Sequence, residues 1–180
     1  MFNKVIDNDR ILCLSENGTN NLMWGHYANS HKGFIIEFDT RYLKEPIRIK
    51  YTKEIQSLKL MTYIEYYFTK NKILGKQIGK EIMEALGCKL YDWEYEEEYR
   101  IILSNEPRKN LLVCDKENYS IIRYPNKPIV KSIIFGCRMP KEVRQYIIDK
   151  IPYQVKFKEV IELKSKLKIV DYKGTDLYIK

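Results

Sequence analysis

The stretch NLMWGHYANSHKGFIIEFD, residues 21–39, predicts a short helix, a tight turn and a strand in immediate succession. Polar turn residues precede the helical segment NLMWGHYA, and either Thr19 or Asn20 is placed to cap its first turn. The segment FIIEFD alternates in the way expected of a half-buried strand. The stretch also contains both histidines of the chain, His26 and His31.

The sequence on either side continues with short strands and few helices. Residues 57–88 show helical periodicity, with an expected break at Asn71 or Gly75. A second helix is expected at MPKEVRQYIIDKI, with Pro140 in its first turn. Further strands are expected at RILCLS, PIRIKYTKE, EEYRIILS, LLVCD, SIIRY and IVKSIIFG, and one or two more in the tail.

These elements together predict an α+β fold. We expect a single domain over residues 1–180, with a bent or split, mostly antiparallel sheet and flanking helices. FIIEFD and EEYRIIL are expected to be its central strands. Trp24 and Trp93 are expected to be at least partly buried near one another.

Composition predicts a globular protein of the cytoplasm. Of the 180 residues, 44% are hydrophobic and 31% are charged, as in soluble globular chains. No apolar run approaches the roughly 18 residues that a membrane span requires, and MFNKVIDNDRIL lacks the apolar core of a secretory signal. We therefore expect a cytoplasmic location and no membrane partner.

The cysteines do not indicate a metal site. Cys13, Cys88, Cys114 and Cys137 are scattered without a CxxC pair, and the chain has no HExxH motif. Disulfides are rare in the cytosol. We therefore expect buried free thiols and no bound metal.

The net charge of +8 permits an anionic partner such as a nucleotide, a nucleic acid or an acidic protein. Seven of the lysines lie in the strand-rich tail, residues 151–180. There, lysines alternate with apolar residues in YQVKFKEVIELKSKLKIVDY, which is also the pattern of strands with a solvated lysine face. Both interpretations stay open at this point.

A second unusual stretch is KLYDWEYEEEYRIIL, residues 89–103, where glutamates crowd the start of an apolar strand. On an extended strand, Glu96 and Glu98 point to the same side. Two such carboxylates repel, which raises one pKa unless Arg100 or Lys89 relieves the repulsion. The pair could serve in acid–base chemistry or bind a hydroxyl. It could equally be a charged strand edge that prevents aggregation.

These segments resemble an uncharacterised bacterial domain-of-unknown-function family with the pattern MWxHYA…GxxIEF…WxYExEYR. The resemblance extends over about residues 11–150. The matching positions are Ser15, Met23, Trp24, His26, Tyr27, Ala28, His31, Gly33, Glu37, Phe38, Lys89, Trp93, Tyr95, Glu96, Glu98, Tyr99, Arg100 and Gly136.

More distantly, the order of elements is similar to that of the ADP-ribosyltransferase superfamily. That resemblance implies NAD as a substrate, whose nicotinamide–ribose bond breaks through an oxocarbenium-like state that a carboxylate stabilises. It implies Glu98 as the catalytic residue, with Glu96 and His26 beside it in a cleft. It implies nucleotide contacts from the residues Trp24, Tyr27, Ser15, His31 and Arg100.

The chain departs from the superfamily at its start, because residues 1–10 contain no counterpart of the usual basic first strand. Three functions are therefore open. One is an NAD-dependent transferase, such as a toxin or phage-defence effector that modifies nucleic acid or protein. Another is a catalytically degenerate module that binds a nucleotide, a nucleic acid or a protein. The third is a structural or regulatory subunit whose motif residues only hold the core together.

Overall fold

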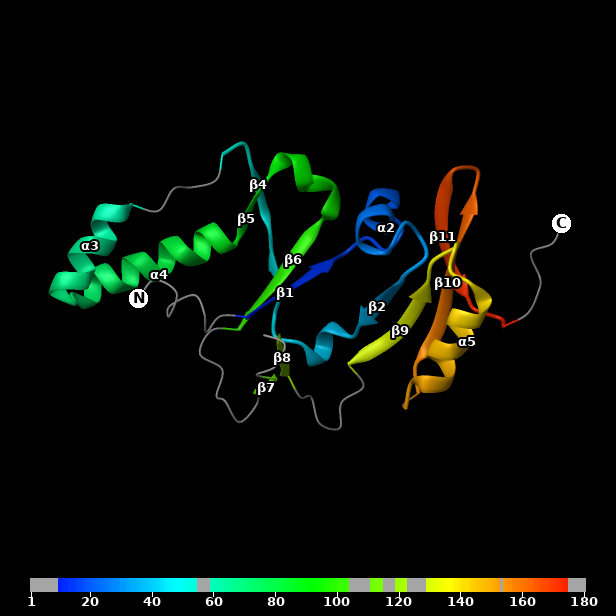
Figure 1. Cartoon of the computed structure of the whole chain (residues 1–180). Helices are drawn as coiled ribbons and strands as arrows, with labels where there is room; N and C mark the ends of the chain where they lie inside the picture. Colours follow the sequence, from blue (N-terminus) through cyan, green and yellow to red (C-terminus); the bar gives the residue numbers. More distant parts are fainter. Residues whose placement is uncertain are drawn as a thin grey trace. The chain divides into compact units, whose positions relative to one another are not determined.

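The computed structural model describes residues 10–54, 59–103, 111–114, 119–122, 129–152 and 154–174. The chain combines helices with mostly antiparallel strand pairs, which confirms the α+β class (Figure 1). The chain divides into two compact units. The first comprises Met1–Arg10, Asn17–Glu45 and Leu103–Lys180, and the second comprises Ile11–Glu16 and Pro46–Ile102. The single-domain organisation over residues 1–180 stays a prediction.

The first unit is built on a four-stranded sheet of order β11-β10-β9-β2 (Figure 1). Strand β9 pairs in parallel with β10, whereas the β2–β9 and β10–β11 pairs are antiparallel. A separate antiparallel pair is formed by β7 and β8. The elements are α2 (Asn21–Tyr27), β2 (Phe34–Phe38), η1 (Thr40–Tyr42), β7 (Leu111–Cys114), β8 (Tyr119–Ile122), β9 (Val130–Phe135), α5 (Lys141–Lys150), β10 (Lys156–Leu163) and β11 (Lys166–Asp171).

The two faces of this sheet carry two apolar clusters, because neighbouring residues of β9 point to opposite sides. Ile134 packs with Trp24 and Ala28 from the α2 segment and with Val160. Ile133 and Phe135 instead pack with Met139 and the apolar residues of α5. The sheet is therefore covered by α2 on one face and by α5 on the other.

Local interactions fix the helix and turn that the sequence predicted before β2. Asn20 caps α2, since its Oδ1 accepts hydrogen bonds from the N–H groups of Leu22 at 2.9 Å and Met23 at 3.3 Å. The turn then runs through three consecutive left-handed residues, Asn29, Ser30 and His31, with φ of 47°, 52° and 68°. The left-handed conformation is unfavourable for residues other than glycine, so contacts with the surrounding structure must stabilise this turn.

Glycine is required where this turn meets the loop after β9. A Cβ at Gly136 would lie 2.1 Å from the His31 carbonyl oxygen. The approach is held by backbone hydrogen bonds from Gly136 N–H to the Gly33 carbonyl at 2.9 Å and from Arg138 N–H to the His31 carbonyl at 3.1 Å. The loop after β9 therefore fixes the turn after α2.

The prediction that FIIEFD is a central strand is wrong. In the described part of the chain, β2 lies at the end of its sheet and pairs with β9. The interior positions are held by β9 and β10, because β10 returns in parallel beside β9 and β11 extends the other edge. Both tail strands that the sequence predicted are present.

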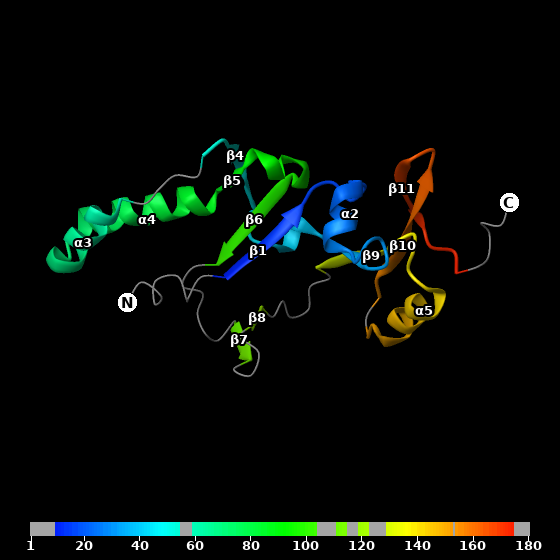
Figure 2. The same cartoon turned by 45° about the horizontal axis from the view of Figure 1, so that its top comes forward.

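The second unit contains a three-stranded sheet of order β1-β6-β3 and a parallel pair formed by β4 and β5. Strand β6 is central, as predicted for EEYRIIL, and β1 and β6 run in opposite directions (Figure 2). Its buried apolar residues include Ile49, Ile78, Ile101 and Ile102. The elements are β1 (Arg10–Ser15), β3 (Ile47–Arg48), β4 (Lys50–Thr52), α3 (Leu60–Thr69), α4 (Lys72–Leu86), β5 (Cys88–Leu90), η2 (Tyr91–Glu96) and β6 (Glu98–Leu103).

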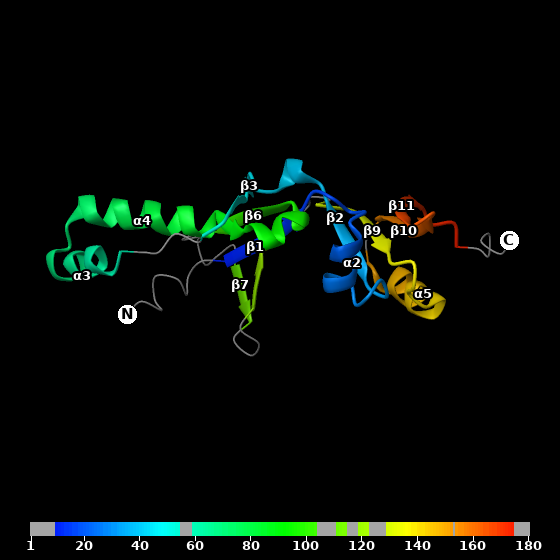
Figure 3. The same ribbon diagram turned by 90° about the horizontal axis from the view of Figure 1, so that it is seen from above.

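The helical region of this unit is a hairpin of α3 and α4 (Figure 3). The break falls at Lys70, which adopts a left-handed conformation with φ of 51°, and Asn71, which caps α4. The predicted break at Asn71 is thus confirmed, and Gly75 lies inside α4. Helix α4 ends at Leu86, so Cys88 belongs to a strand rather than to the predicted helix.

The cysteines and the helices test two further expectations. The thiols of Cys13, Cys88 and Cys137 are free, but Cys13 is exposed and the other two are half-buried, so the prediction of buried thiols is wrong for these three. No helix in the described ranges is both long and apolar enough to cross a membrane.

Candidate functional site

The start of β6 has a conformation that the sequence did not predict. Residues 91–96 form the 3-10 helix η2, Glu97 turns back in a left-handed conformation with φ of 45°, and Glu98 begins the strand. The prediction that Glu96 and Glu98 share one side of an extended strand is therefore wrong. Glu96 ends the 3-10 helix and Glu98 begins the strand, and the left-handed residue Glu97 lies between them.

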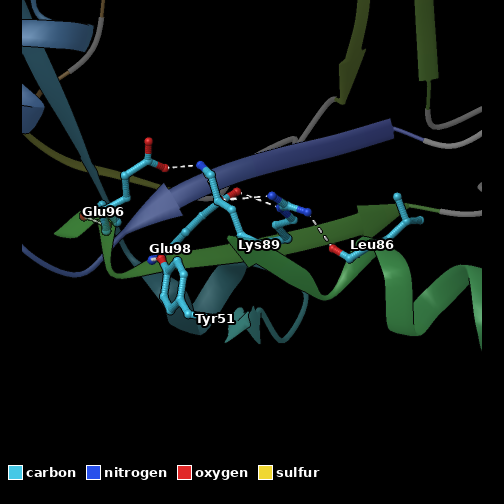
Figure 4. Close-up of polar contacts among 7 residues, drawn as sticks. Tyr51, Leu86, Lys89, Glu96 and Glu98 are labelled. Atoms are coloured by element: carbon cyan, nitrogen blue, oxygen red, sulfur yellow. Dashed lines mark hydrogen bonds and ion pairs between the residues drawn. The ribbon is translucent and has the colours of Figure 1, made fainter. Parts of the chain in front are cut away.

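Glu96 and Glu98 nevertheless converge on one cation (Figure 4). Lys89 Nζ donates to Glu96 Oε2 and, at 3.1 Å, to Glu98 Oε2. Arg100 adds hydrogen bonds from Nε to Glu98 Oε1 at 2.7 Å and from Nη2 to Glu98 Oε2 at 3.1 Å. Both glutamate residues are 4% exposed. We call the set Lys89, Glu96, Glu98 and Arg100 the Glu98 centre.

The cations decide the charge state of this centre. Burial raises the pKa of Glu98, but hydrogen bonds from Arg100, Cys13 and Lys89 outweigh it and lower the pKa to about 2. Burial lowers the pKa of Lys89, yet its bonds to the two glutamates raise it above the usual value. The sequence left open whether repulsion between the two glutamates raises a pKa or whether a nearby cation relieves that repulsion. For Glu98 the cations relieve it, and the carboxylate is ionised at neutral pH.

Neighbouring elements hold the Glu98 centre in position. The hydroxyl of Ser15 in β1 donates to the Glu96 carbonyl at 2.7 Å, and Tyr51 Oη in β4 accepts from the Glu98 N–H at 2.8 Å. Arg100 Nη1 also donates to the Leu86 carbonyl at 2.7 Å, where α4 ends. Since Lys89 lies on β5 and Glu96 on η2, and β1, β4, α4 and β6 also contribute, the centre ties together most elements of the second unit.

Two further side chains border the centre. Trp93, which is 39% exposed, has Lys89 Nζ 5.1 Å from its ring centroid, within cation–π range. Cys13 lies on β1. Although the residue is exposed overall, partial desolvation of its thiol together with a hydrogen bond to Glu98 raises the pKa of Cys13. A thiol with a raised pKa forms little thiolate at neutral pH, which makes Cys13 a weak nucleophile.

The remaining predicted site residues lie in the first unit. Trp24 is 1% exposed, its Nε1 donates to the Gly18 carbonyl at 2.8 Å, and its ring stacks on His31 with centroids 6.2 Å apart. Its surroundings are those of a core residue. Tyr27 is 62% exposed and meets the ring of His26 edge-on, with the centroids 6.3 Å apart.

The structure thus brings together four of the predicted site residues, Ser15, Glu96, Glu98 and Arg100. The predicted cleft between His26 and Glu98, and the proximity of Trp24 to Trp93, stay predictions, because these residues belong to different units. Within the described ranges, no group of three or more His, Cys, Asp or Glu side chains is arranged to hold a metal ion.

Sequence reasoning missed a second carboxylate centre, formed around Glu37 in the first unit. Glu37 accepts from Lys131 Nζ at 2.6 Å, from Lys158 Nζ at 2.7 Å and from the Ser132 hydroxyl. Burial raises the pKa of Glu37, but these hydrogen bonds lower it to about 2. We call this set the Glu37 centre. Its only sequence signal was the glutamate of the GxxIEF motif, because its partners come from distant strands.

Tyr51 was also missed, and no motif marked it. By contrast, the sequence did single out Lys89, because it lies shortly before the glutamates of the WEYEEEYR segment and could relieve their repulsion.

Residues 23–101 match the family model described as "Protein of unknown function (DUF2971)", so this segment is similar to a domain-of-unknown-function family. The match includes both motif halves and Lys89, but it is shorter than the predicted range of about 11–150 and leaves out Ser15 and Gly136. No curated protein and no solved structure matches the chain significantly.

Proposed function

We propose that this chain is a binding module for an anionic partner rather than a transferase. The observation that carries this proposal is the state of Glu98, whose two carboxylate oxygens are occupied by Arg100 and Lys89 in a site that is 4% exposed.

A transferase needs the negative charge of its glutamate at the reacting ribose. An oxocarbenium-like state is stabilised by a carboxylate that is placed in advance and free to act on it. Here the Glu98 charge is balanced by two cations, and withdrawing one partner from a buried ion pair costs about 3–5 kcal/mol. This cost would be added to the barrier of the reaction, which disfavours catalysis by Glu98.

The proposed contact surface for the anionic partner is the β10–β11 hairpin of the first unit. Lys164 lies at its tip with a left-handed φ of 48°, and Lys166 and Lys168 follow on β11, which is an edge strand. All three lysines are exposed. Exposed lysines bind phosphates and release counterions, so a nucleic acid is the partner that the charge favours. Edge-strand lysines that only prevent aggregation are the competing explanation.

Salt-dependent binding of a labelled single-stranded oligonucleotide tests the proposal. Replacing Lys164, Lys166 and Lys168 by Gln should weaken binding and lower the salt slope by about 0.7 for each lysine that contacts a phosphate. The matched control replaces Lys72, Lys76 and Lys80 on α4 by Gln, with the same change in charge. If the hairpin variant binds as wild type does, or the control loses as much, the hairpin is not the contact surface.

The second candidate is the NAD-dependent transferase, and one observation favours it. Two buried carboxylates and a lysine converge at the head of β6, where the superfamily resemblance assigns the catalytic glutamate. Incubation with labelled NAD and a cell extract tests this function. Label transfer by wild type that falls by orders of magnitude in Glu98→Gln would replace our proposal by the transferase. Absence of transfer and of NAD binding by calorimetry would end this candidate.

A further inference from the structure

Helix α3 exposes an unusual amount of apolar surface. Its sequence LMTYIEYYFT is largely apolar and aromatic, yet none of its ten residues, all of which the structure describes, is buried. The exposed fractions are 62% for Leu60, 73% for Met61, 41% for Ile64, 51% for Tyr67 and 78% for Phe68. Large apolar side chains that are exposed side by side on a protein surface often mark a site that binds a protein or a membrane.

The exposed residues form one face of the helix. Residues three and four apart are neighbours on a helix, so Leu60, Ile64 and Phe68 form one row, with Met61 and Tyr67 beside it. The contact with α4 is made elsewhere, because a Cβ at Gly75 of α4 would lie 2.9 Å from the Tyr66 ring. Tyr66 therefore faces α4, and the face containing Leu60, Ile64 and Phe68 is left without a partner in the described ranges. We call it the α3 face.

A second copy of the chain is a poor occupant of the α3 face on charge grounds. Lys59 precedes α3, Lys70 and Lys72 follow it, and Glu65 is its only acid. In an antiparallel two-fold pairing Lys59 would approach Lys70 of the other copy, and in a parallel pairing each lysine would meet its own equivalent. Either arrangement places like charges at both ends of a short apolar contact.

The same charges favour a negatively charged surface. Lys70 lies at the rim of the face, with its Nζ 4.5 Å from the Tyr67 ring centroid. Lys59, at the other end of α3, is exposed as well, so a lysine lies at each end of the helix. Apolar and aromatic side chains flanked by lysines suit the boundary between headgroups and acyl chains of an anionic bilayer.

We propose that the α3 face docks the α3–α4 hairpin onto the surface of a bilayer that contains anionic lipids. Leu60, Ile64 and Phe68 enter the acyl boundary, while the lysines extend to the headgroups. The sequence led us to expect no membrane partner because no apolar run could span a bilayer. An interfacial helix needs no such run, and this inference is independent of the proposed nucleic-acid contact on β10–β11.

Sedimentation with lipid vesicles tests the proposal on the full chain. Wild type should bind vesicles of phosphatidylcholine mixed with phosphatidylserine and should bind pure phosphatidylcholine at least about 25-fold more weakly. Ile64→Ser with Phe68→Ser should reduce binding at least about tenfold, since apolar burial supplies the contact. Lys70→Gln with Lys72→Gln should reduce binding to the anionic vesicles by about fivefold per lysine.

The matched control is Tyr146→Ser on α5, where an aromatic side chain that is 63% exposed is removed from the first unit. It should bind as wild type does. Circular dichroism and thermal unfolding of each variant show whether its fold is intact. Equal binding by the serine variant and wild type, or no preference for anionic vesicles, would overturn the proposal. So would a wild type that ignores vesicles but forms a dimer that Ile64→Ser with Phe68→Ser dissolves, because the face would then be a self-association surface.

Discussion

The two motif halves of this sequence, residues 21–39 and 89–103, are held by different interactions in the two units. In the first unit, the helix and turn of residues 21–33 are fixed by apolar burial of Trp24 and by close backbone contact at Gly136. In the second unit, residues 89–100 are fixed by buried charges around Glu98. Packing is insensitive to pH and is only weakly affected by salt, whereas a charge network depends on the protonation of each member. The two halves should therefore respond differently to the same perturbations.

Lys89→Met should have the largest effect, because Lys89 is shared by two buried carboxylates. The substitution keeps the apolar stem of the side chain but removes the positive charge that balances the Glu96 and Glu98 carboxylates. Breaking a buried ion pair costs about 3–5 kcal/mol. We expect the free energy of unfolding in urea to fall by about that amount. Lys80→Met is the control, since the Lys80–Glu84 pair is exposed and 3.7 Å long, and it should change stability by less than about 0.5 kcal/mol. Equal effects of the two variants would show that the Glu98 centre is not a buried network.

Acid should destabilise the fold around residues 89–103, because protonation of Glu98 removes the charge that pairs with Lys89 and Arg100. Its pKa is about 2 in the folded chain and 4.5 for an unperturbed glutamate, so the carboxylate stabilises the fold above pH 4.5 and loses this contribution as the pH falls to about 2. We therefore expect the difference in unfolding free energy between wild type and Glu98→Gln to be constant above pH 5 and to shrink between pH 4.5 and 2. Urea titrations at several pH values measure it. A difference that does not vary with pH would mean that Glu98 acts through its shape and not through its charge.

Gly136→Ala should destabilise the first unit by an interaction that involves no charge. A Cβ at this position would lie 2.1 Å from the His31 carbonyl oxygen, so the turn after α2 must shift, at a cost of about 1–3 kcal/mol. The loss should be the same at pH 7 and at pH 4. Gly25→Ala within α2 is the matched control, because its Cβ would meet nothing within 4 Å and alanine favours a helix. If the two alanine variants are equally stable, the close approach of the two loops is not what holds the turn.

The same contrast explains what could be predicted from the sequence. Local signals narrowed the cap of α2 to Thr19 or Asn20 and the helix break to Asn71 or Gly75, and the strong apolar run of EEYRIIL predicted the central position of β6. The sequence could not give the left-handed turn at Glu97, because that conformation is imposed by contacts with β1 and β4. It also could not show that β10 pairs in parallel beside β9, which moved β2 to an edge. Such pairings join segments that are distant in the chain, and many registers compete for them.

The candidate site divides in the same way. The motif pointed to Glu96, Glu98, Arg100 and Lys89, since ionisable residues at the head of an apolar strand are unusual. The sequence named Arg100 and Lys89 as alternatives that could relieve the repulsion between the two glutamates, but it did not indicate that both would pair with Glu98. The Glu37 centre was missed because Lys131 and Lys158 come from β9 and β10, and only the sheet brings them to Glu37.

Glu37→Gln should have the smallest effect, although its pKa is also about 2. The side chain of Glu37 is 27% exposed and that of Lys131 is 57% exposed, so solvent screens the Glu37 centre far more than the Glu98 centre. The side-chain oxygen of glutamine can still accept a hydrogen bond from the Ser132 hydroxyl. We therefore expect the free energy of unfolding to fall by at most about 1 kcal/mol, and by less in high salt. Urea unfolding at low and high ionic strength measures both values. A loss as large as that of Lys89→Met, or one that salt does not reduce, would mean that the first unit also depends on a buried charge network, and the contrast between the two motif halves would not hold.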